Sequence, residues 1–218
     1  MQKIYRNYYV LISLLFLLVS QAWAIGPLKV GFSGGISIPN KSVSNVLNSG
    51  EEVDWESDKN GYNLGLNLRF DIPLTDWGLQ GGIFYHNFPK SEGIYSINKE
   101  KDGAFTINKS IIAFSAGVNY ELFSVAEIVD FYIGTAPTYN YIIYTAELLD
   151  TGINIPLIDD GESVSDGRLG LNFSTGIDIN AVVFTGNIEV KYSMLNLVGA
   201  DNGEDLKSFF ALSVGFYF

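Results

Sequence analysis

Hydrophobic and polar side chains alternate residue by residue in eight separate segments of the chain. Between Gly61 and Asp71, every even-numbered residue is Tyr, Leu or Phe, whereas the odd-numbered positions hold Gly, Asn, Arg and Asp. A period of two residues is typical of a β-strand whose two faces meet different surroundings. The eight segments are 28–38, 61–71, 77–86, 106–122, 129–141, 168–180, 182–193 and 209–218. The pattern therefore predicts an all-β protein of eight strands. We also expect Pro137 to cause a bulge or a weak point in the fifth strand, because proline lacks the backbone donor.

The connections between these segments alternate in length. Three of them are short, at 72–76, 123–128 and 180–181, and four are long, at 39–60, 87–105, 142–167 and 194–207. If consecutive strands are antiparallel, all the short turns and both termini lie at one end. Short turns at one end and long loops at the other are typical of outer-membrane barrels.

The period alone does not say which face of the barrel is apolar. A secreted barrel with an apolar cavity is the alternative to a membrane barrel with a polar lumen. An eight-stranded barrel has an interior that side chains just fill, and Gly, Ser and Asn fit that space better than repeated Leu, Ile and Phe. Aromatic residues near the ends of the apolar stripes indicate two interfacial girdles. They are Phe70, Trp77, Tyr120, Phe131, Phe184 and Phe218 near the short turns, and Tyr62, Tyr85, Tyr139 and Tyr192 near the long connections. We therefore predict an up-and-down transmembrane β-barrel with an apolar exterior.

The N-terminus has the pattern of a secretory signal peptide. Lys3 and Arg6 precede an apolar run at 8–19, and the small residues Ala22 and Ala24 follow it. A membrane-anchor helix is the alternative, but it needs roughly twenty apolar residues. We expect residues 1–24 to be cleaved and 25–218 to form the barrel domain. This predicts export to the outer membrane of a Gram-negative-type bacterium.

Charged residues on the predicted inward face balance one another. Because charges in a narrow lumen need partners, we expect an ion-pair network that fills it, with Arg69 as the hub of a cluster near the short turns. A gated narrow pore is the alternative. The network comprises Lys29, Arg69, Asp71, Glu121, Asp130, Arg168, Asp178, Glu189, Lys191 and Lys207.

The rest of the acidic charge falls in the connections. The chain has 13 Lys and Arg against 24 Asp and Glu and no Cys, which argues against a nucleic-acid partner and excludes cysteine-based chemistry. The acidic groups could collect divalent cations that bridge to lipopolysaccharide, face a basic partner, or simply be solvated. Segment 201–205 lacks EF-hand spacing, so we predict no metal site and no cofactor. The groups are Glu51, Glu52, Asp54, Glu56 and Asp58; Asp159, Asp160, Glu162 and Asp166; and Asp201, Glu204 and Asp205.

The sequence offers few candidate catalytic residues. His86 is the one histidine of the chain, its parity points it inward, and no serine stands near it in the pattern of barrel lipid deacylases. Nucleophilic catalysis requires a nucleophile beside a base. We predict no enzymatic activity, and a lipid-modifying enzyme is the third alternative after the structural barrel and the channel.

The end of the chain carries the most specific resemblance. Phe210, Leu212, Val214, Phe216 and Phe218 share one face and end on an aromatic residue. Together with the features above, this resembles the small outer-membrane β-barrel proteins of the OmpX type and the OmpA barrel domain, within the porin family. The resemblance implies that the barrel assembly machinery reads this ending, that lipid and lipopolysaccharide surround the protein, and that it is a monomer. From the filled lumen and the acidic connections we expect a structural or surface-interaction role, with a narrow channel for small or hydrophobic solutes as the first alternative.

Overall fold

The computed structural model describes residues 28–40, 43–47, 51–55, 59–97, 100–126, 128–148, 163–181, 183–200 and 206–218. All of its regular structure in these ranges is β-strand, and no helix in them is long and apolar enough to cross a membrane. The predicted signal peptide, residues 1–24, lies outside the described residues. The strands are β1 (Leu28–Pro39), β2 (Val43–Leu47), β3 (Glu51–Trp55), β4 (Gly61–Asp71), β5 (Trp77–Ile97), β6 (Glu100–Val125), β7 (Val129–Leu148), β8 (Ser163–Asn180), β9 (Thr185–Val198) and β10 (Ser208–Tyr217).

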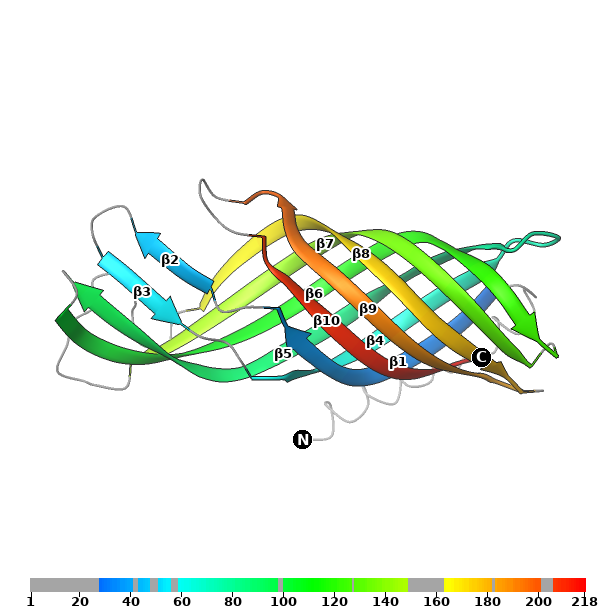
Figure 1. Cartoon of the computed structure of the whole chain (residues 1–218), viewed down its shortest axis with the longest axis horizontal. Coiled ribbons are helices and arrows are strands. Elements are labelled where there is room, and N and C mark those ends of the chain that lie inside the picture. The colour runs from blue at the N-terminus through cyan, green and yellow to red at the C-terminus, as the bar shows by residue number, and fades with distance from the viewer. Residues whose placement is uncertain are drawn as a thin grey trace, which may run out of the picture.

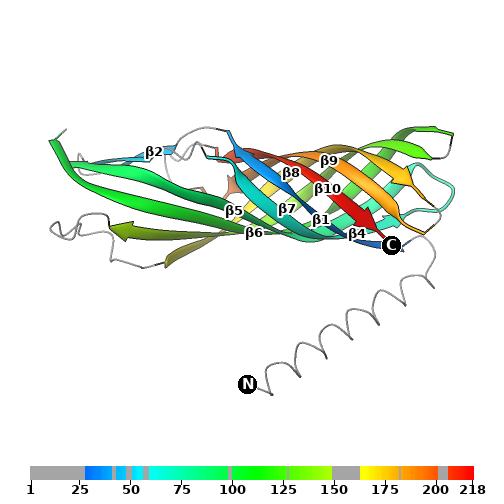
Figure 2. The ribbon, with the colours of Figure 1, turned by 90° about the horizontal axis from the view of Figure 1, so that it is seen from below.

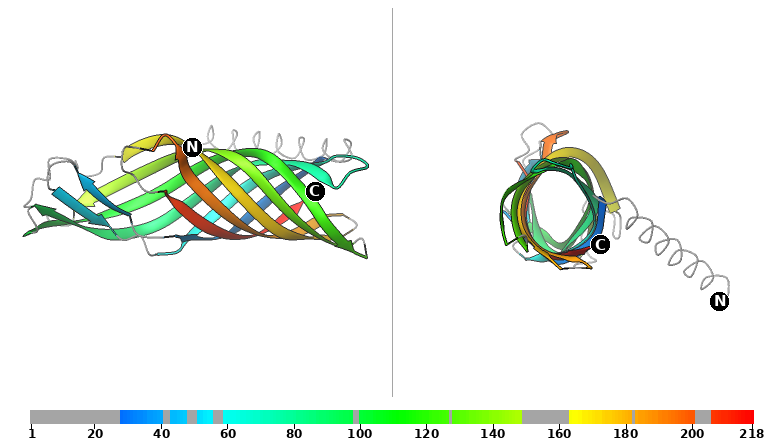
Figure 3. Two further views of the ribbon diagram at one scale, coloured as in Figure 1. Left: turned by 45° about the horizontal axis from the view of Figure 1, so that its top comes forward. Right: turned by 90° about the vertical axis from the view of Figure 1, so that its right-hand side faces the viewer.

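Eight of these strands form a closed antiparallel barrel. Its order is β5-β4-β1-β10-β9-β8-β7-β6, and the pairing of β5 with β6 closes the ring. The view along the barrel axis shows this closed ring (Figure 3). The first and last strands pair over nine residue positions, from Gly31 opposite Tyr217 to Pro39 opposite Phe209. The predicted eight-stranded up-and-down barrel is confirmed.

The predicted assignment of the two faces also holds. Outward side chains such as Leu64, Leu68 and Phe173 are about half exposed, whereas the inward Asn63 and Asn172 are buried. The apolar face is therefore outside, where it matches hydrocarbon rather than a core.

Strands β5, β6, β7 and β8 are much longer than the pattern predicted, and they extend past the barrel. Strand β6 has 26 residues and β5 has 21, whereas β10 has 10. A membrane-spanning strand needs roughly 9–11 residues. Connection 87–105 is therefore a hairpin of continuing strands, and connection 39–60 contains β2 and β3. We call the extended ends of β5–β8, with β2 and β3, the outer sheet (Figure 1).

The strands of the outer sheet were not predicted because they lack the alternating pattern of membrane strands. A strand above the hydrocarbon needs no lipid-facing apolar side, so the period of two that marks a membrane strand is lost there. A register shift between Phe88 and Ser91 marks the change. Strand β3 pairs with β5 beyond this point, from Gly93 to Ile97. Seen from below, the outer sheet again extends past the ends of β1 and β10 (Figure 2).

Of the two outcomes expected at Pro137, the bulge is absent and the weak point is present. Ser115 pairs with Thr138 and Val118 with Thr135, so the register of β6 against β7 is the same on both sides of the proline. The ladder is interrupted between these pairs, as the missing donor requires. The irregularity in this strand pair lies instead between Glu121 and Phe123.

Candidate functional site

Arg69 lies inside the barrel, near the end that carries the short turns. Its side chain, which is 3 % exposed, forms an ion pair with Asp178. Strands β4 and β8 are four positions apart in the ring of eight, so this ion pair crosses the lumen. The guanidinium carbon lies 4.4 Å from the ring centre of Tyr132 and 4.8 Å from that of Tyr217. One cation thus joins four strands across the barrel.

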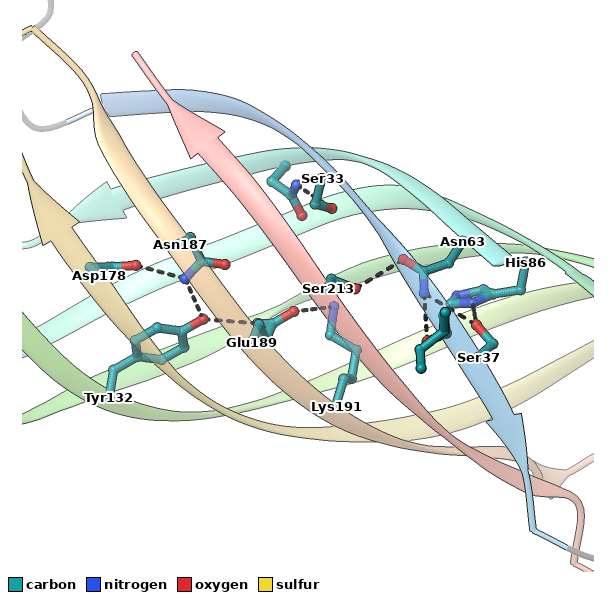
Figure 4. Close-up of polar contacts among 12 residues, drawn as sticks. Ser33, Ser37, Asn63, His86, Tyr132, Asp178, Asn187, Glu189, Lys191 and Ser213 are labelled. Carbon is teal, nitrogen blue, oxygen red and sulfur yellow. Dashed lines mark hydrogen bonds and ion pairs between the residues drawn. The ribbon is translucent and has the colours of Figure 1, made fainter. Parts of the chain in front are cut away.

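A chain of polar contacts continues from Asp178 along the lumen (Figure 4). Asn187 donates to Asp178 at 2.7 Å and to the Tyr132 hydroxyl at 3.0 Å. That hydroxyl donates to Glu189 at 3.1 Å, and Glu189 pairs with Lys191 at 2.9 Å. We call Arg69, Tyr132, Asp178, Asn187, Glu189 and Lys191 the inner network. Every charge in it has a partner of opposite sign, which burial in a narrow lumen requires.

Phe84 is the residue that breaks the polar face of β5. Its side chain points inward, and the Lys191 ammonium lies 3.7 Å from the centre of its ring. A cavity of about 20 Å³ beside it is lined by Glu189, Lys191, Asn172 and Tyr217 among others. This volume holds about one water molecule and is too small for a solute path.

A second polar cluster lies further from the short turns and contains His86. Its Nδ1 is 2.9 Å from the Ser37 hydroxyl, and Asn63 donates to that hydroxyl at 3.3 Å. Ser213 donates to the Asn63 carbonyl oxygen at 2.9 Å. The sequence analysis expected no serine near His86 in the pattern of barrel lipid deacylases. The structure places Ser37 there, because β1 and β5 lie on either side of β4 and both side chains face the lumen. Both residues of the pair are buried, Ser37 fully, so a substrate does not reach the pair.

The outer half of the lumen is apolar, which the sequence analysis did not predict. Its side chains come from β5, β6, β7, β9 and β10, and they form the cluster Phe88, Ile111, Ile142, Leu195, Phe209 and Ala211, with Tyr144 packed against it. We call this cluster the outer plug. The His86 ring meets the Phe209 ring at 4.6 Å, so the plug lies directly on the second polar cluster. The polar lumen therefore occupies the half nearer the short turns.

Polar groups border the plug. The Lys207 ammonium donates to the Tyr144 hydroxyl at 3.3 Å, and Asn140 donates to the Leu195 carbonyl at 3.0 Å. Arg168, predicted for the lumen network, is buried and pairs with Asp166, which had been assigned to a loop.

The remaining predicted network residues lie at the rim beside the short turns. Lys29 pairs with Asp71 at 2.9 Å, with both side chains partly exposed. Asn180 donates to Asp130, and Glu121 lies within electrostatic range of Asp71, Asp76 and Asp130. The structure thus separates the predicted cluster into a buried pair around Arg69 and a more exposed rim. Tyr132, Tyr217 and Asn187 were missed, although their inward parity was readable in the sequence.

The predicted girdle residues all point outward or lie at the strand ends, and several pair across strands. The Trp77 and Tyr120 rings are tilted against each other by 59°, with centres 5.0 Å apart, and the Tyr62 ring centre lies 6.2 Å from that of Tyr85. Tyr139, Phe184 and Phe218 are exposed, whereas Phe70, Phe131 and Tyr192 are half-buried. In the predicted assembly signal, Phe210, Leu212, Val214, Phe216 and Phe218 all face outward.

Most of the predicted acidic groups lie outside the described residues. Glu51, Glu52 and Asp54 belong to β3, for which the structure gives the backbone and its pairing. Asp166 is described above. Glu56, Asp58, Asp159, Asp160, Glu162, Asp201, Glu204 and Asp205 lie outside. The part of the chain that the structure describes holds no group of three or more His, Asp or Glu arranged to bind a metal ion.

Strand order, closure and the outward apolar face decide the architecture. The chain folds as a closed, eight-stranded antiparallel β-barrel with an apolar outer face. No protein-family model and no curated protein sequence matches it. Among solved structures, the attachment invasion locus protein Ail of Yersinia pestis is 16% identical with a TM-score of 0.47, covering 88% of this chain and 99% of Ail. Neisserial surface protein A is 15% identical with a TM-score of 0.49, covering 88% and 96% of the two chains.

The N-terminal β-barrel domain of Pseudomonas aeruginosa OprF is also similar. It is 12% identical with a TM-score of 0.41, covering 87% of this chain and 97% of the domain. These identities and TM-scores are too low to carry an argument about activity or ligands. The fold of this barrel rests on the strand pairing in its own structure.

Proposed function

We propose that this protein is a closed, non-enzymatic barrel that anchors an extracellular sheet for surface interactions. The single observation that carries the proposal is the contrast between the two ends of one set of strands. Strands β5–β7 run roughly ten or more residues past a membrane-spanning length, while the lumen below them is filled by side chains. Long strands above a filled barrel are better suited to presenting an extracellular surface to a partner than to transporting solutes.

The filled lumen supports the first half of the proposal. The Arg69–Asp178 pair crosses it near the short turns, and the outer plug fills it at the other end. Solute passage would have to break both an ion pair and an apolar cluster. A narrow channel for small or hydrophobic solutes is therefore our second choice.

The proposal also includes the location of the protein and its route to the membrane. Residues 1–24 direct export, the outer membrane of a Gram-negative-type bacterium is the destination, and the barrel assembly machinery inserts a monomer among lipid and lipopolysaccharide. The short turns then face the periplasm and the outer sheet faces the exterior. A lipid-modifying activity is disfavoured because Ser37 and His86 are buried.

A variant with a shortened β5–β6 hairpin tests separately whether the barrel is closed and whether the outer sheet mediates surface interactions. Phe88 faces Lys109 across the β5–β6 pair, so residues 89–108 can be replaced by Asn-Gly, the favoured two-residue hairpin turn. We expect the shortened protein to insert and resist heat like the wild type but to lose adhesion of expressing cells to surfaces and to one another. A variant with Asn-Gly inserted after Leu74, at the opposite end, is the matched control.

Conductance is the second readout of the same experiment. Pure refolded wild type and shortened protein should both give planar bilayers without reproducible unitary steps. Steps in the wild type would favour the channel. Equal adhesion by the shortened and wild-type proteins would refute a role for the outer sheet.

A further inference from the structure

An apolar groove lies on the outer surface of the barrel, beside the short-turn end. It has a volume of about 490 Å³ and crosses β5, β6, β7 and β8. Its lining includes the aromatic side chains of Trp77, Tyr120 and Phe173 and the shorter side chains of Val118, Ile133 and Thr135. Thr135 is the short side chain at the centre, opposite Val118 on one side and Phe173 on the other. The next outward pair toward the outer end, Gly81 and Ala116, is small as well.

The groove has an aromatic end and a charged rim. Trp77 directly follows the turn that holds Asp76, and Tyr120 lies opposite Trp77 on β6. Aromatic side chains of this kind sit at the headgroup level of a membrane. The Tyr120 hydroxyl donates to Asp76 at 3.4 Å, and the Glu121 backbone donates to the Asp76 carbonyl at 2.8 Å. Glu121 is in electrostatic range of Asp71 and Asp130 as well. Lys29, which also influences Glu121, pairs with Asp71 at 2.9 Å.

We infer that this groove binds one acyl chain of a phospholipid that carries an ammonium headgroup, in the membrane leaflet at the short turns. The outward face of the spanning strands meets lipid, so the occupant enters from the bilayer. An acyl chain fits an apolar trough that starts at headgroup level. The Asp76 carboxylate at the groove, together with Glu121 on the lumen side of the same rim, attracts an ammonium group and repels an anionic headgroup, so phosphatidylethanolamine is favoured over phosphatidylglycerol.

A second groove on the same barrel provides an internal control. It has a volume of about 290 Å³ and is lined by Ile179, Phe184, Ile188, Val214 and Phe216, among others. Its aromatic end is also at a short turn, but that turn reads Ala-Val-Val-Phe at 181–184 and carries no charge. The second groove, which has an apolar shape but no acidic rim, can therefore be compared with the first groove, which has both.

Native mass spectrometry of the full barrel tests the inference. The wild type, titrated with phosphatidylethanolamine or phosphatidylglycerol of identical chains, should retain one phosphatidylethanolamine at least about threefold better, the preference expected of exposed charge pairs. Asp76→Asn with Glu121→Gln should remove the preference but keep chain binding. Thr135→Phe, which fills the groove, should remove binding of both lipids.

Gly186→Leu is the matched control in the second groove, where an added Cβ would meet only the Ile179 carbonyl, at 3.9 Å. It should leave the preference unchanged. Equal retention of the two lipids by the wild type would overturn the inference, as would equal losses in Thr135→Phe and Gly186→Leu. A wild-type dimer that Thr135→Phe dissociates would show that a second copy of the chain occupies the groove, which also overturns it.

Discussion

Arg69 shows how one residue can tie the whole lumen together. It is the cation of a buried pair whose partner belongs to the opposite side of the ring, and two tyrosine rings cover its guanidinium. Removing one member of a buried ion pair leaves the other charge without compensation, which costs far more than loss of an exposed pair.

Replacing Arg69 should therefore destabilise the barrel strongly. We expect Arg69→Met to lower the free energy of unfolding by about 3–5 kcal/mol. Lys29→Met, which removes the partly exposed pair with Asp71, should cost below about 1 kcal/mol. Urea unfolding of the refolded proteins in liposomes, followed by tryptophan fluorescence, measures both. Equal losses in the two variants would show that Arg69 is not the hub.

The inward residues could be predicted, but their partners could not. Parity alone placed Arg69, Asp178 and Glu189 in the lumen. Which of them meet depends on how the strands are staggered around the ring, which no local pattern encodes. For the same reason the contact between Ser37 and His86 could not be predicted, since the two residues are 49 positions apart in sequence.

At the scale of elements, the pairing of β1 with β10 closes the barrel. Phe218 accepts a hydrogen bond from the Val30 amide at 3.0 Å and donates one to the Val30 carbonyl at 2.9 Å. Its ring faces outward. Phe218 thus has two separable contributions, a backbone pair that extends the seam and an aromatic side chain offered to lipid or to the assembly machinery.

Two variants separate these contributions. Deleting Phe218 should cost about 1–3 kcal/mol from the two hydrogen bonds, while Phe218→Ala keeps them. If the aromatic ending is an assembly signal, both variants should lose insertion in cells, whereas refolding of Phe218→Ala into liposomes should match the wild type. Membrane fractionation and heat-shifted electrophoresis report the two yields. Normal insertion of Phe218→Ala in cells would contradict the signal.

Strand existence was predictable at this scale, and strand length was not. The alternation from Gly61 to Asp71 matches β4 exactly at both ends because hydrocarbon acts on the whole strand. Strand β5 runs on to Ile97 because β3 and β6 pair with its backbone, and backbone pairing leaves little mark on side-chain polarity.

For the whole molecule, the lumen contains two unlike layers in series. The outer plug excludes water because it is apolar, and the inner network fills its half with paired charges. We propose that either layer alone stops ions, because each fills its own half of the lumen with side chains. Removing one layer should therefore admit water to its own half without creating a channel.

The absence of cysteine from the chain makes this prediction measurable with single introduced thiols. Ala211 lies in the outer plug and Ala136 lines the small cavity beside the inner network. With Phe88→Ala and Phe209→Ala, at a cost of about 3–5 kcal/mol each, Ala211→Cys should become reactive to a charged thiol reagent added from outside. Ala136→Cys should stay unreactive and the bilayer silent, because the Arg69–Asp178 pair still crosses the lumen. Labelling of Ala136→Cys, or unitary steps, in the plug-deleted barrel would mean that the inner network is porous and that the plug alone closes the protein.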